Sequence, residues 1–438
     1  MLYTKEITSK GKFDVLVAGG GVAGFCAAVA AARMGKKVAL LENNGALGGI
    51  LTAGGNPQIG IFYAYYKQAI SGIGWELCKN LQAQGWAEIP DFATIDTRLG
   101  GIPSNVKVCA PMAEAEMDRM CLAAGVELFF HTKIVDAVVE NGAICGVIAA
   151  EKGGLTLFTA DVYVDCTGDG DLSVLAGADY EKSPVLQPGT LGYRFRTQNI
   201  DALSEEVLRE HFQCKKEKGE VLHGDFWPEY HAPILNYFME GGDNANHVVM
   251  DGSTADGLTK AEVAGREKMA RMLNFASKEA DITVGGVAAY TAARETRRIV
   301  CDMQISKTDF LTGKLYEDSV CYGYYNIDLH TYEENNALVG QSLPDGVVPA
   351  VPYRALCVKG LKNLLVAGRC ACADREVMSA LRVKASCMAM GQAAGTAAAL
   401  ATEKSGAVRD VDIPLLKQTL QGSGAIVPSE QLFSPAKN

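Results

Sequence analysis

The sequence predicts an α/β fold organised around a central parallel sheet, and three segments near its start carry this prediction. Residues 13–18 and 37–42 are short, continuously apolar runs, as expected for parallel strands that are covered on both faces. Residues 22–34, between them, have the pattern of a helix that is apolar on nearly every side. Together they make a βαβ unit, whose crossover we expect to be right-handed.

A second group of strand patterns follows a predicted helix at residues 112–124. Turn signals separate these strands, notably at Asn141-Gly142 and Gly153-Gly154. Strands that lie so close together in the chain favour an antiparallel meander. The predicted strands are residues 126–131, 134–139, 143–149, 155–159 and 161–165.

The middle of the chain, from about residue 190 to 350, has a different pattern, because polar and aromatic residues increase there and glycines no longer mark strand ends. It contains two amphipathic helix patterns, at residues 204–212 and 260–279. The buried-strand pattern returns at residues 363–367, and a helix of small residues follows at 383–402. The two ends of the chain therefore resemble each other more than either resembles the middle.

The balance of basic and acidic residues indicates which classes of partner the chain should not bind. It has 41 basic and 51 acidic residues, a formal net charge of −10. Such a charge repels phosphate backbones and anionic membrane surfaces, so we expect neither nucleic acid nor a membrane as a partner. Residues 1–12 lack the apolar core of a signal peptide, and the apolar runs at 22–32 and 387–401 are too short or broken by glycine to span a bilayer. The expected location is cytoplasmic.

The cysteines and acidic residues give no metal signature. None of the 13 cysteines forms a Cys-x-x-Cys pair, which disfavours iron–sulfur clusters and structural zinc. Cys370 and Cys372 are interpreted as buried packing residues, with a redox pair as the alternative. Asp169 and Asp171 are better explained by a turn after a strand than by a metal ion. We expect no metal site.

The turn after the first predicted strand has the pattern of a dinucleotide site. Gly19 permits a tight turn, Gly21 lets the backbone approach a pyrophosphate, and Gly24 allows close packing of helix and strand. The helix N-terminus offers N–H groups and a positive dipole end to phosphates. Glu42 ends the second strand, where it can accept hydrogen bonds from ribose hydroxyls. A tight turn in an unrelated α/β protein is the alternative, but strand, helix and acid all agree with the nucleotide interpretation.

A second glycine-rich stretch follows Glu42 and selects the kind of dinucleotide. Residues 43–55 include Gly48 and Gly49 and can form a loop that follows a long cofactor toward its flavin. A nicotinamide site does not need this second stretch. The sequence therefore predicts FAD as the cofactor.

Six further segments, in order along the chain, give the sequence a family resemblance. They read VDCTGDGD at 164–171, RETRRI at 294–299, DLH at 328–330, VPYR at 351–354, NLLVAGRC at 363–370 and MGQAAGT at 390–396. They are similar to the ATGDGD, REsRRI, DIH, IPYR, NLLVAGRC and LGQAAGTA segments of FAD-dependent oxidoreductases. The sequence thus resembles the fumarate reductase and hydroxybenzoate hydroxylase-like flavoprotein superfamily over most of its length.

The resemblance implies a Rossmann-like FAD-binding domain with a central parallel sheet and a β-meander, plus an inserted α+β substrate domain. The FAD-binding domain would be discontinuous, formed by residues 1–190 and 350–438, with the substrate or cap domain at 191–349. The flavin ring would lie between the segment after Gly368 and the N-terminal part of the 383–402 helix. The residues that the resemblance adds to the cofactor site are Thr167, Gly168, Gly368, Ala393 and Ala394. Close helix packing through small residues would explain residues 391–395 equally well.

Catalytic candidates come from segments that should meet the flavin. Arg382 matches an arginine beside the flavin in fumarate reductase flavoproteins, where a guanidinium can clamp a carboxylate or support flavin charge. Close relatives often read THEAHGSIR here, but Arg375 and Met378 stand in place of both histidines, which points to an altered substrate. His330 is the remaining histidine candidate for proton transfer, with a structural hydrogen bond to Asp328 as the alternative.

The segment at 294–299 supplies the third candidate, Arg294. Together with Arg297 and Arg298 it either binds an anionic substrate or FAD, or forms a salt-bridged strand entrance. The other histidines show no pairing pattern and are interpreted as surface or structural residues. They are His131, His211, His223, His231 and His247.

The leading function hypothesis is an FAD-dependent dehydrogenase or reductase that transfers a hydride between flavin and a small, anionic or polyhydroxylated metabolite. The electron donor or acceptor is unknown, since no second dinucleotide fingerprint marks an NAD(P)H domain. The alternatives are an FAD-dependent monooxygenase, and an electron-transfer or RNA-modifying relative of the same fold. The halogenase motif Trp-x-Trp-x-Ile is absent around Trp75, Trp86 and Trp227.

Overall fold

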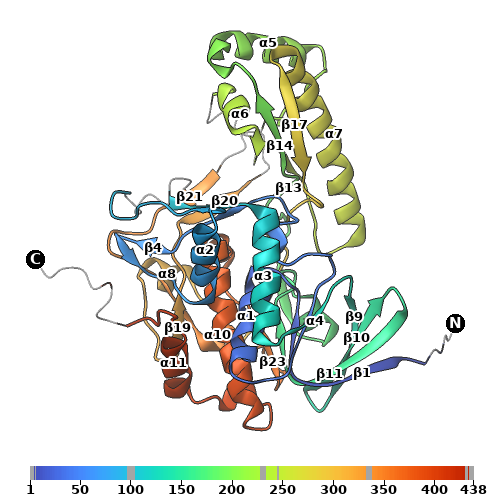
Figure 1. Ribbon diagram of the computed structural model, residues 1–438, viewed down its shortest axis with the longest axis vertical. Helices are drawn as coiled ribbons and strands as arrows, with labels where there is room; N and C mark the ends of the chain where they lie inside the picture. Colours follow the sequence, from blue (N-terminus) through green and yellow to red (C-terminus); the bar gives the residue numbers. More distant parts are fainter. Residues whose placement is uncertain are drawn as a thin grey trace, which may run out of the picture.

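A computed structural model gives the structure of the chain, and it describes residues 4, 6–95, 104–226, 233–243, 246–331, 338–429 and 433. His231 and Trp227 lie outside these ranges. The described part is a mixed α/β structure whose sheet is rich in parallel strands, and its fold is Rossmann-like as the sequence predicted. Figure 1 shows this body below a smaller, elongated lobe.

The central sheet has the strand order β8-β2-β1-β11-β10-β9, with β23 also paired to β11. Strands β1, β2, β8 and β23 all run parallel to their partners, whereas β9, β10 and β11 form the antiparallel meander. The seven strands are β1 (Thr8–Ala18), β2 (Val38–Leu41), β8 (Glu127–Phe129), β9 (Lys133–Glu140), β10 (Ala143–Glu151), β11 (Gly154–Asp165) and β23 (Leu364–Val366).

Two details of the predicted meander were wrong. The segment predicted as a strand at 126–131 is β8, which pairs in parallel with β2 and takes no part in the meander. The two strands predicted at 155–159 and 161–165 are one continuous strand, β11. β1 pairs with this strand along nearly its whole length, whereas β10 pairs only with its first half and β23 only with its last residues. Ala160, between the two predicted strands, therefore lies within one long strand and not in a turn.

Helices α1 (Val22–Arg33) and α10 (Lys384–Thr402) pack side by side, and both contact strands β1 and β11 of the sheet. Gly391 and Gly395 permit this approach, because a Cβ atom at either position would collide with the backbone carbonyls of Ala23 and Ala27. The small-residue interpretation of residues 391–395 is therefore confirmed. The other helices of this body are α2 (Ile73–Ala83), α3 (Ala110–Ala124), α4 (Asp171–Leu175), α8 (Lys307–Leu311), α9 (Arg375–Leu381) and α11 (Ile413–Gly422).

The smaller lobe, green to yellow in Figure 1, is built around a three-stranded sheet of order β15-β14-β17. It has its own hydrophobic core, which includes Phe195, Tyr237 and Phe275. Its elements are β14 (Tyr193–Thr197), α5 (Glu205–Glu217), α6 (Leu235–Glu240), β15 (Gly242–Asp243), α7 (Ala255–Glu279) and β17 (Ile282–Val287). The domain division at residues 190 and 350 stays a prediction.

Short strands fill the region between the lobe and the main sheet, and several carry site residues. Pairs form between β13 and β16, β12 and β18, and β20 and β21. They are β12 (Tyr180–Lys182), β13 (Gly189–Thr190), β16 (His247–Val248), β18 (Arg297–Ile299), β20 (Ile327–His330) and β21 (Leu338–Gln341). Further short strands are β3 (Gln58–Ile59), β4 (Tyr63–Ala64), β5 (Lys67–Gln68), β6 (Ala87–Glu88), β7 (Val106–Val108), β19 (Ser319–Tyr322) and β22 (Ala350–Pro352). Within the described ranges, no helix has the length and apolar character needed to cross a membrane.

Candidate functional site

A cleft of about 820 Å³ runs from the carboxyl end of the parallel sheet into the smaller lobe. Glycine-rich turns line one part, and arginine and histidine side chains line another. Most of the site residues expected from the sequence meet here: Gly19, Gly21, Glu42, Gly48, Gly49, Thr167, Gly168, Arg294, His330, Gly368 and Arg382. Residues from widely separated parts of the chain thus share one cavity.

The turn between β1 and α1 has the geometry that its glycines predict. Gly19 has φ +90°, and a Cβ atom there would lie 2.7 Å from the carbonyl oxygen of Cys166. Gly21 faces open space and caps α1 without a side-chain hydrogen bond, so the helix N-terminus opens into the cleft. Gly24 lies within α1 against the carbonyl of Gly19, where any side chain would collide. Gly24 thus serves helix packing, and Gly19 and Gly21 shape the cavity wall.

Glu42 follows β2 and joins the first turn to the loop after it. Its carboxylate accepts hydrogen bonds from Gly20 N at 2.6 Å, Asn44 N at 2.7 Å and Asn44 Nδ2 at 2.9 Å. The side chain is 7% exposed and borders the cleft. Three donors fix its position before any ligand is present.

The second glycine-rich stretch folds against the first turn. Gly48 donates its N–H to Gly20 O at 2.8 Å, and both Gly48 and Gly49 have positive φ, +99° and +56°. Both angles lie in the left-handed region that glycine adopts without strain. The loop therefore continues the cleft wall from the first turn, and the ring of Tyr290 also lines the cleft here.

The carboxyl end of β11 adds Thr167 and Gly168 to the wall. Asp165 holds this turn, because it accepts hydrogen bonds from Thr167 N at 3.0 Å, Thr167 Oγ1 at 2.7 Å and Ser173 N at 2.8 Å. Asp169 accepts from Arg369 Nη2 at 2.7 Å. Asp169 is thus engaged in an ion pair, and within the described ranges no group of three or more His, Cys, Asp or Glu side chains could hold a metal ion.

The predicted residues Ala393 and Ala394 lie elsewhere. Both are fully buried in the middle of α10, and neither is among the described residues that line the cleft. The N-terminal end of the same helix reaches the cavity through Val383, Lys384 and Cys387. The helix is placed as expected, but its contact with the cleft lies about two turns earlier than the two alanines.

The cationic part of the cleft contains all three catalytic candidates. Arg294 donates to Pro188 O at 2.9 Å and to Thr190 Oγ1 at 2.6 Å. Arg382, at the C-terminus of α9, donates through Nη2 to both the backbone and the side-chain oxygen of Asp328 at 3.1 Å. His330 Nε2 lies 3.2 Å from Asp328 Oδ2. The structural alternative considered for His330 is therefore present, within the same cluster as Arg382.

Electrostatics sets the charges of this cluster. Burial, reinforced by the positive charge of Arg382, lowers the pKa of Arg294 to about 9, so the guanidinium stays protonated at neutral pH. Burial opposes ionisation of Asp328, but the hydrogen bond with His330 and the charge of Arg382 outweigh it and lower the pKa to about 2. Burial and the charge of Arg294 lower the pKa of His330 to about 4, although Asp328 acts in the opposite sense.

These shifts correct the reason given for His330 as a proton-transfer residue. The sequence argument relied on a histidine pKa near neutrality, whereas the buried imidazole is neutral at pH 7. An ionised carboxylate only accepts hydrogen bonds, so Nε2 of His330 carries the proton directed at Asp328. At neutral pH the ring holds Asp328 in place and does not act as a charged acid.

His247 is a member of the cationic cluster that sequence reasoning missed. It was interpreted as a surface or structural residue without a pairing pattern, but it is fully buried and its Nε2 lies 3.3 Å from His330 Nδ1. Its backbone pairs with Thr190, whose hydroxyl accepts from Arg294. The two histidines are 83 residues apart and come from β16 and β20, so no local spacing could reveal the pair.

A cleft at the carboxyl edge of a parallel sheet, opening on the N-terminus of a glycine-capped helix, defines a dinucleotide-binding protein of Rossmann type. The family model described as FAD dependent oxidoreductase matches residues 14–420, and the chain belongs to this family. The protein is therefore an FAD-dependent oxidoreductase, and FAD is its cofactor.

Individual relatives are more distant. The tRNA uridine 5-carboxymethylaminomethyl modification enzyme MnmG of Protochlamydia amoebophila is 33% identical over 149 residues, which are 32% of this chain and 22% of that protein. The same enzyme from Aquifex aeolicus is 33% identical over 144 residues, again 22% of its length. The matched part thus spans about a fifth of these curated relatives.

Solved structures resemble the chain over more of its length. A geranylgeranyl bacteriochlorophyll reductase-like protein from Thermoplasma acidophilum is 13% identical with a TM-score of 0.41, covering 94% of this chain and 82% of its own. The anhydrotetracycline hydroxylase OxyS from Streptomyces rimosus is 13% identical with a TM-score of 0.44, covering 94% and 65%.

The relation to MnmG corrects one expectation from the sequence. The acidic net charge excluded nucleic acid as a partner, yet the curated relatives are named as enzymes that modify tRNA. The exclusion was wrong because net charge averages over the whole surface, whereas nucleic acid needs only a local complementary site. Charge balance does not rule out this class of partner for the chain.

Proposed function

We propose that this FAD-dependent oxidoreductase is a dehydrogenase or reductase that transfers a hydride between the flavin and a small metabolite carrying a carboxylate. Bound FAD supplies the hydride chemistry, and the protein supplies binding, orientation and charge. In this proposal residues 1–190 and 350–438 bind FAD, and residues 191–349 form a cap over the substrate.

The cleft supports a specific assignment of the cofactor residues. Gly19 and Gly21 face the pyrophosphate together with the N-terminus of α1, and Glu42 receives the ribose hydroxyls. Gly48 and Gly49 lie along the cofactor on one side. Thr167, Gly168 and Gly368 lie on the other, at the ends of β11 and β23. No side chain except Glu42 and Thr167 is needed in this set, since backbone N–H groups make the contacts.

The observation that carries the substrate assignment is the convergence of two arginines, Arg294 buried and Arg382 15% exposed. Arg294 and Arg382 border the same cleft, and the charge of Arg382 lowers the pKa of Arg294, so the two cations act on each other. Arg382 Nε is buried without a hydrogen-bond partner among the described residues. A carboxylate placed between the two guanidinium groups would relieve their repulsion and accept charge-assisted hydrogen bonds.

The remaining residues of the cluster orient this clamp. Asp328 holds Arg382 through two hydrogen bonds, and neutral His330 donates to the same carboxylate. Ser379 Oγ accepts the N–H of Asp328 at 2.9 Å, which ties β20 to α9. We assign Arg294 and Arg382 to substrate binding, and His330 to the orientation of Asp328.

An anaerobic screen of small carboxylic acids, with flavin absorbance as the signal, tests this function. A substrate should bleach the oxidised flavin, or reoxidise flavin that dithionite has reduced. Alcohols and sugars without an anionic group serve as matched controls. Bleaching by neutral compounds alone would contradict the carboxylate assignment, and oxygen consumption coupled to NADPH would favour a monooxygenase.

The similarity to MnmG supports a second candidate, a flavoenzyme that acts on RNA. Filter binding with tRNA at several salt concentrations distinguishes the two functions. Tight, salt-sensitive binding would favour the RNA function, because phosphate contacts release counterions. No retention at low salt would leave the small-molecule function.

A further inference from the structure

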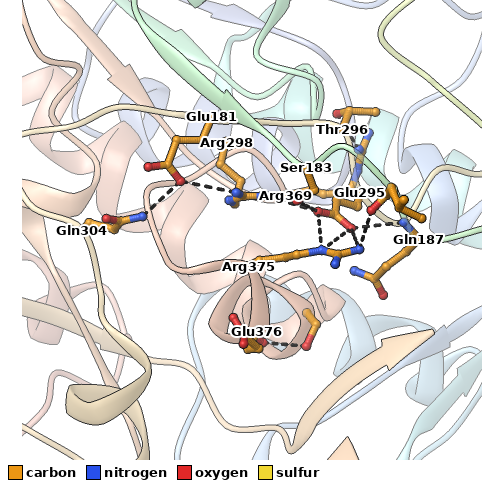
Figure 2. A network of polar contacts seen from close by, with 12 residues as sticks. Glu181, Ser183, Gln187, Glu295, Thr296, Arg298, Gln304, Arg369, Arg375 and Glu376 are labelled. Atoms are coloured by element: carbon orange, nitrogen blue, oxygen red, sulfur yellow. Dashed lines mark hydrogen bonds and ion pairs between the residues drawn. The ribbon is translucent and has the colours of Figure 1, made fainter. Parts of the chain in front are cut away.

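Glu295 is a buried carboxylate behind the cleft wall. It is connected to the three residues of the proposed substrate site, Arg294, His330 and Arg382. Its side chain is 4% exposed, and it follows Arg294 directly in the chain. Figure 2 shows donors approaching it from several segments. It accepts hydrogen bonds from Ser183 Oγ at 2.7 Å, Gln187 N at 3.1 Å, Arg298 Nη1 at 3.2 Å, and Arg375 Nε and Nη2 at 2.9 and 3.1 Å.

One connection leads from Glu295 to His330. The carboxylate holds the backbone N–H of Gln187, and the side-chain oxygen of Gln187 accepts the backbone N–H of His330 at 3.2 Å. Gln187 is 2% exposed, so water does not replace these bonds. The position of β20 therefore depends on the segment that Glu295 holds.

A second connection leads from Glu295 to Arg382. Arg375, at the start of α9, contacts both oxygens of the carboxylate, in a two-bonded geometry that fixes direction as well as distance. Arg382 ends the same helix, two turns away. Arg375 itself is not among the described cleft-lining residues, so its replacement of a family histidine changes the anchor of α9 and not a group on the cavity surface.

We propose that Glu295 is a positioning residue that sets the relative placement of Arg294, His330 and Arg382, and thereby the geometry of the anion clamp; this rests on the proposed function. Arg294 is held because it is the neighbour of Glu295 in the chain. His330 is held through Gln187, and Arg382 through Arg375 and α9. A single carboxylate behind the wall thus aligns three side chains that come from three separate segments.

The sign of the effect on anion binding separates positioning from simple electrostatics. Glu295→Gln removes a negative charge near the clamp, and electrostatics alone would make an anion bind more tightly. Arg375→Met removes a positive charge and would electrostatically weaken anion binding. The positioning role predicts weaker binding in both variants, because both break the same two-bonded contact.

The test uses the FAD-loaded enzyme and malonate as the probe, with the perturbation of flavin absorbance giving Kd. We expect about tenfold weaker malonate binding in Glu295→Gln and in Arg375→Met, and no further weakening in the double variant, since the two residues form one contact. Tighter binding in Glu295→Gln would overturn the positioning role. Additive losses in the double variant would also contradict it.

Glu181→Gln is the matched control. Glu181 is half exposed and contacts Arg298 Nη2 at 3.3 Å, so the variant removes the same charge from the same network. Glu181 touches neither Gln187 nor Arg375 in any hydrogen bond between described residues, as Figure 2 illustrates. Malonate should bind this variant as it binds the wild type. An equal loss of malonate affinity in Glu181→Gln and Glu295→Gln would show that Glu295 acts only through its charge, and would overturn its positioning role.

Hydrogen–deuterium exchange supplies a readout that needs no ligand. In Glu295→Gln, exchange should rise in peptides covering residues 183–188, 327–331 and 375–382, with no change at 15–30 in the nucleotide-binding turn. Unchanged exchange at 327–331 and 375–382 would overturn the connections to His330 and Arg382. If wild-type enzyme binds no malonate while exchange rises as expected, the carboxylate function fails and the positioning by Glu295 stands. Should Glu295→Gln fail to retain FAD, Arg375→Lys, which keeps the charge but loses the two-bonded contact, takes its place in both measurements.

Discussion

The two ends of the cleft are built on different principles. The nucleotide end consists of several turns, within each of which the residues lie next to one another in the sequence, and backbone geometry forms most of its wall. The cationic end combines side chains from three separate segments. Arg294 lies just before β18, His330 ends β20, and Arg382 ends α9. Hydrogen bonds through other residues hold them together. Local sequence therefore determines the first end, whereas the second depends on how distant segments meet.

The largest effect should come from the nucleotide end. Gly24→Val places a side chain against the carbonyl of Gly19, and overpacking between α1 and β1 costs about 1–3 kcal/mol or more. We expect the variant to lose FAD and much of its soluble yield. Flavin absorbance per mole of desalted protein measures this. Gly153→Ala is the control, because a Cβ atom there meets nothing within 4 Å.

The next effect should appear at the cationic end. Arg382→Met should retain FAD but lower the rate of flavin reduction by the substrate about 10²-fold, because it removes a charge that the protein holds in place for the reacting complex. Stopped-flow absorbance gives the rate. Arg33→Met, which breaks a half-exposed pair with Glu76, should leave the rate unchanged. An unchanged rate of flavin reduction in Arg382→Met would contradict the proposal that the cationic end binds the substrate.

A smaller effect is expected at Glu42. Glu42→Ala removes the acceptor of three hydrogen bonds and the proposed ribose contact, so FAD should dissociate about tenfold more readily. Fluorescence of released flavin after dilution measures Kd. Undiminished retention would count against the ribose role and leave Glu42 as a brace for Gly20 and Asn44.

The smallest expected effect is the pH dependence of stability at the cationic end. The folded pKa of His330, about 4, lies below its ordinary value of 6.5, so the unfolded chain binds more protons between these values and stability falls as pH falls through that window. Asp328, with a folded pKa of about 2 against 3.8, acts in the same direction at lower pH.

His330→Asn should therefore flatten the stability curve. Between pH 7 and 5 the wild type should lose about 1–2 kcal/mol more than this variant, measured by urea unfolding at each pH. A variant curve as steep as that of the wild type would mean that His330 is not buried in its neutral form.

The sequence could predict the nucleotide end because each requirement there is local. A positive φ at Gly19, a collision-free helix start at Gly21 and an acid at the end of β2 are all readable from one stretch of chain. The continuity of β11 escaped prediction, because β10 pairs only with its first half and the break in pattern at Ala160 resembles a turn. The contact of α10 with the cleft was misjudged by about two turns, since small residues serve packing and ligand approach alike.

The cationic end was only partly predictable. Arg294, His330 and Arg382 were found from their family segments, but the pairing of His247 with His330 depends on β16 meeting β20, and the two residues are 83 positions apart. The role of Arg375 was also hidden, because its partner Glu295 lies 80 residues earlier in the chain. The neutral state of His330 follows from burial and from two nearby guanidinium groups, and neither is a property of the local sequence.

The most direct test of the account is a crystal structure of the protein with FAD and malonate. We expect the pyrophosphate against Gly19 and Gly21, the adenosine ribose within hydrogen-bond distance of Glu42, and a malonate carboxylate between Arg294 and Arg382. A flavin nucleotide bound away from the β1–α1 turn, or malonate bound in the cleft without contacting either arginine, would contradict it.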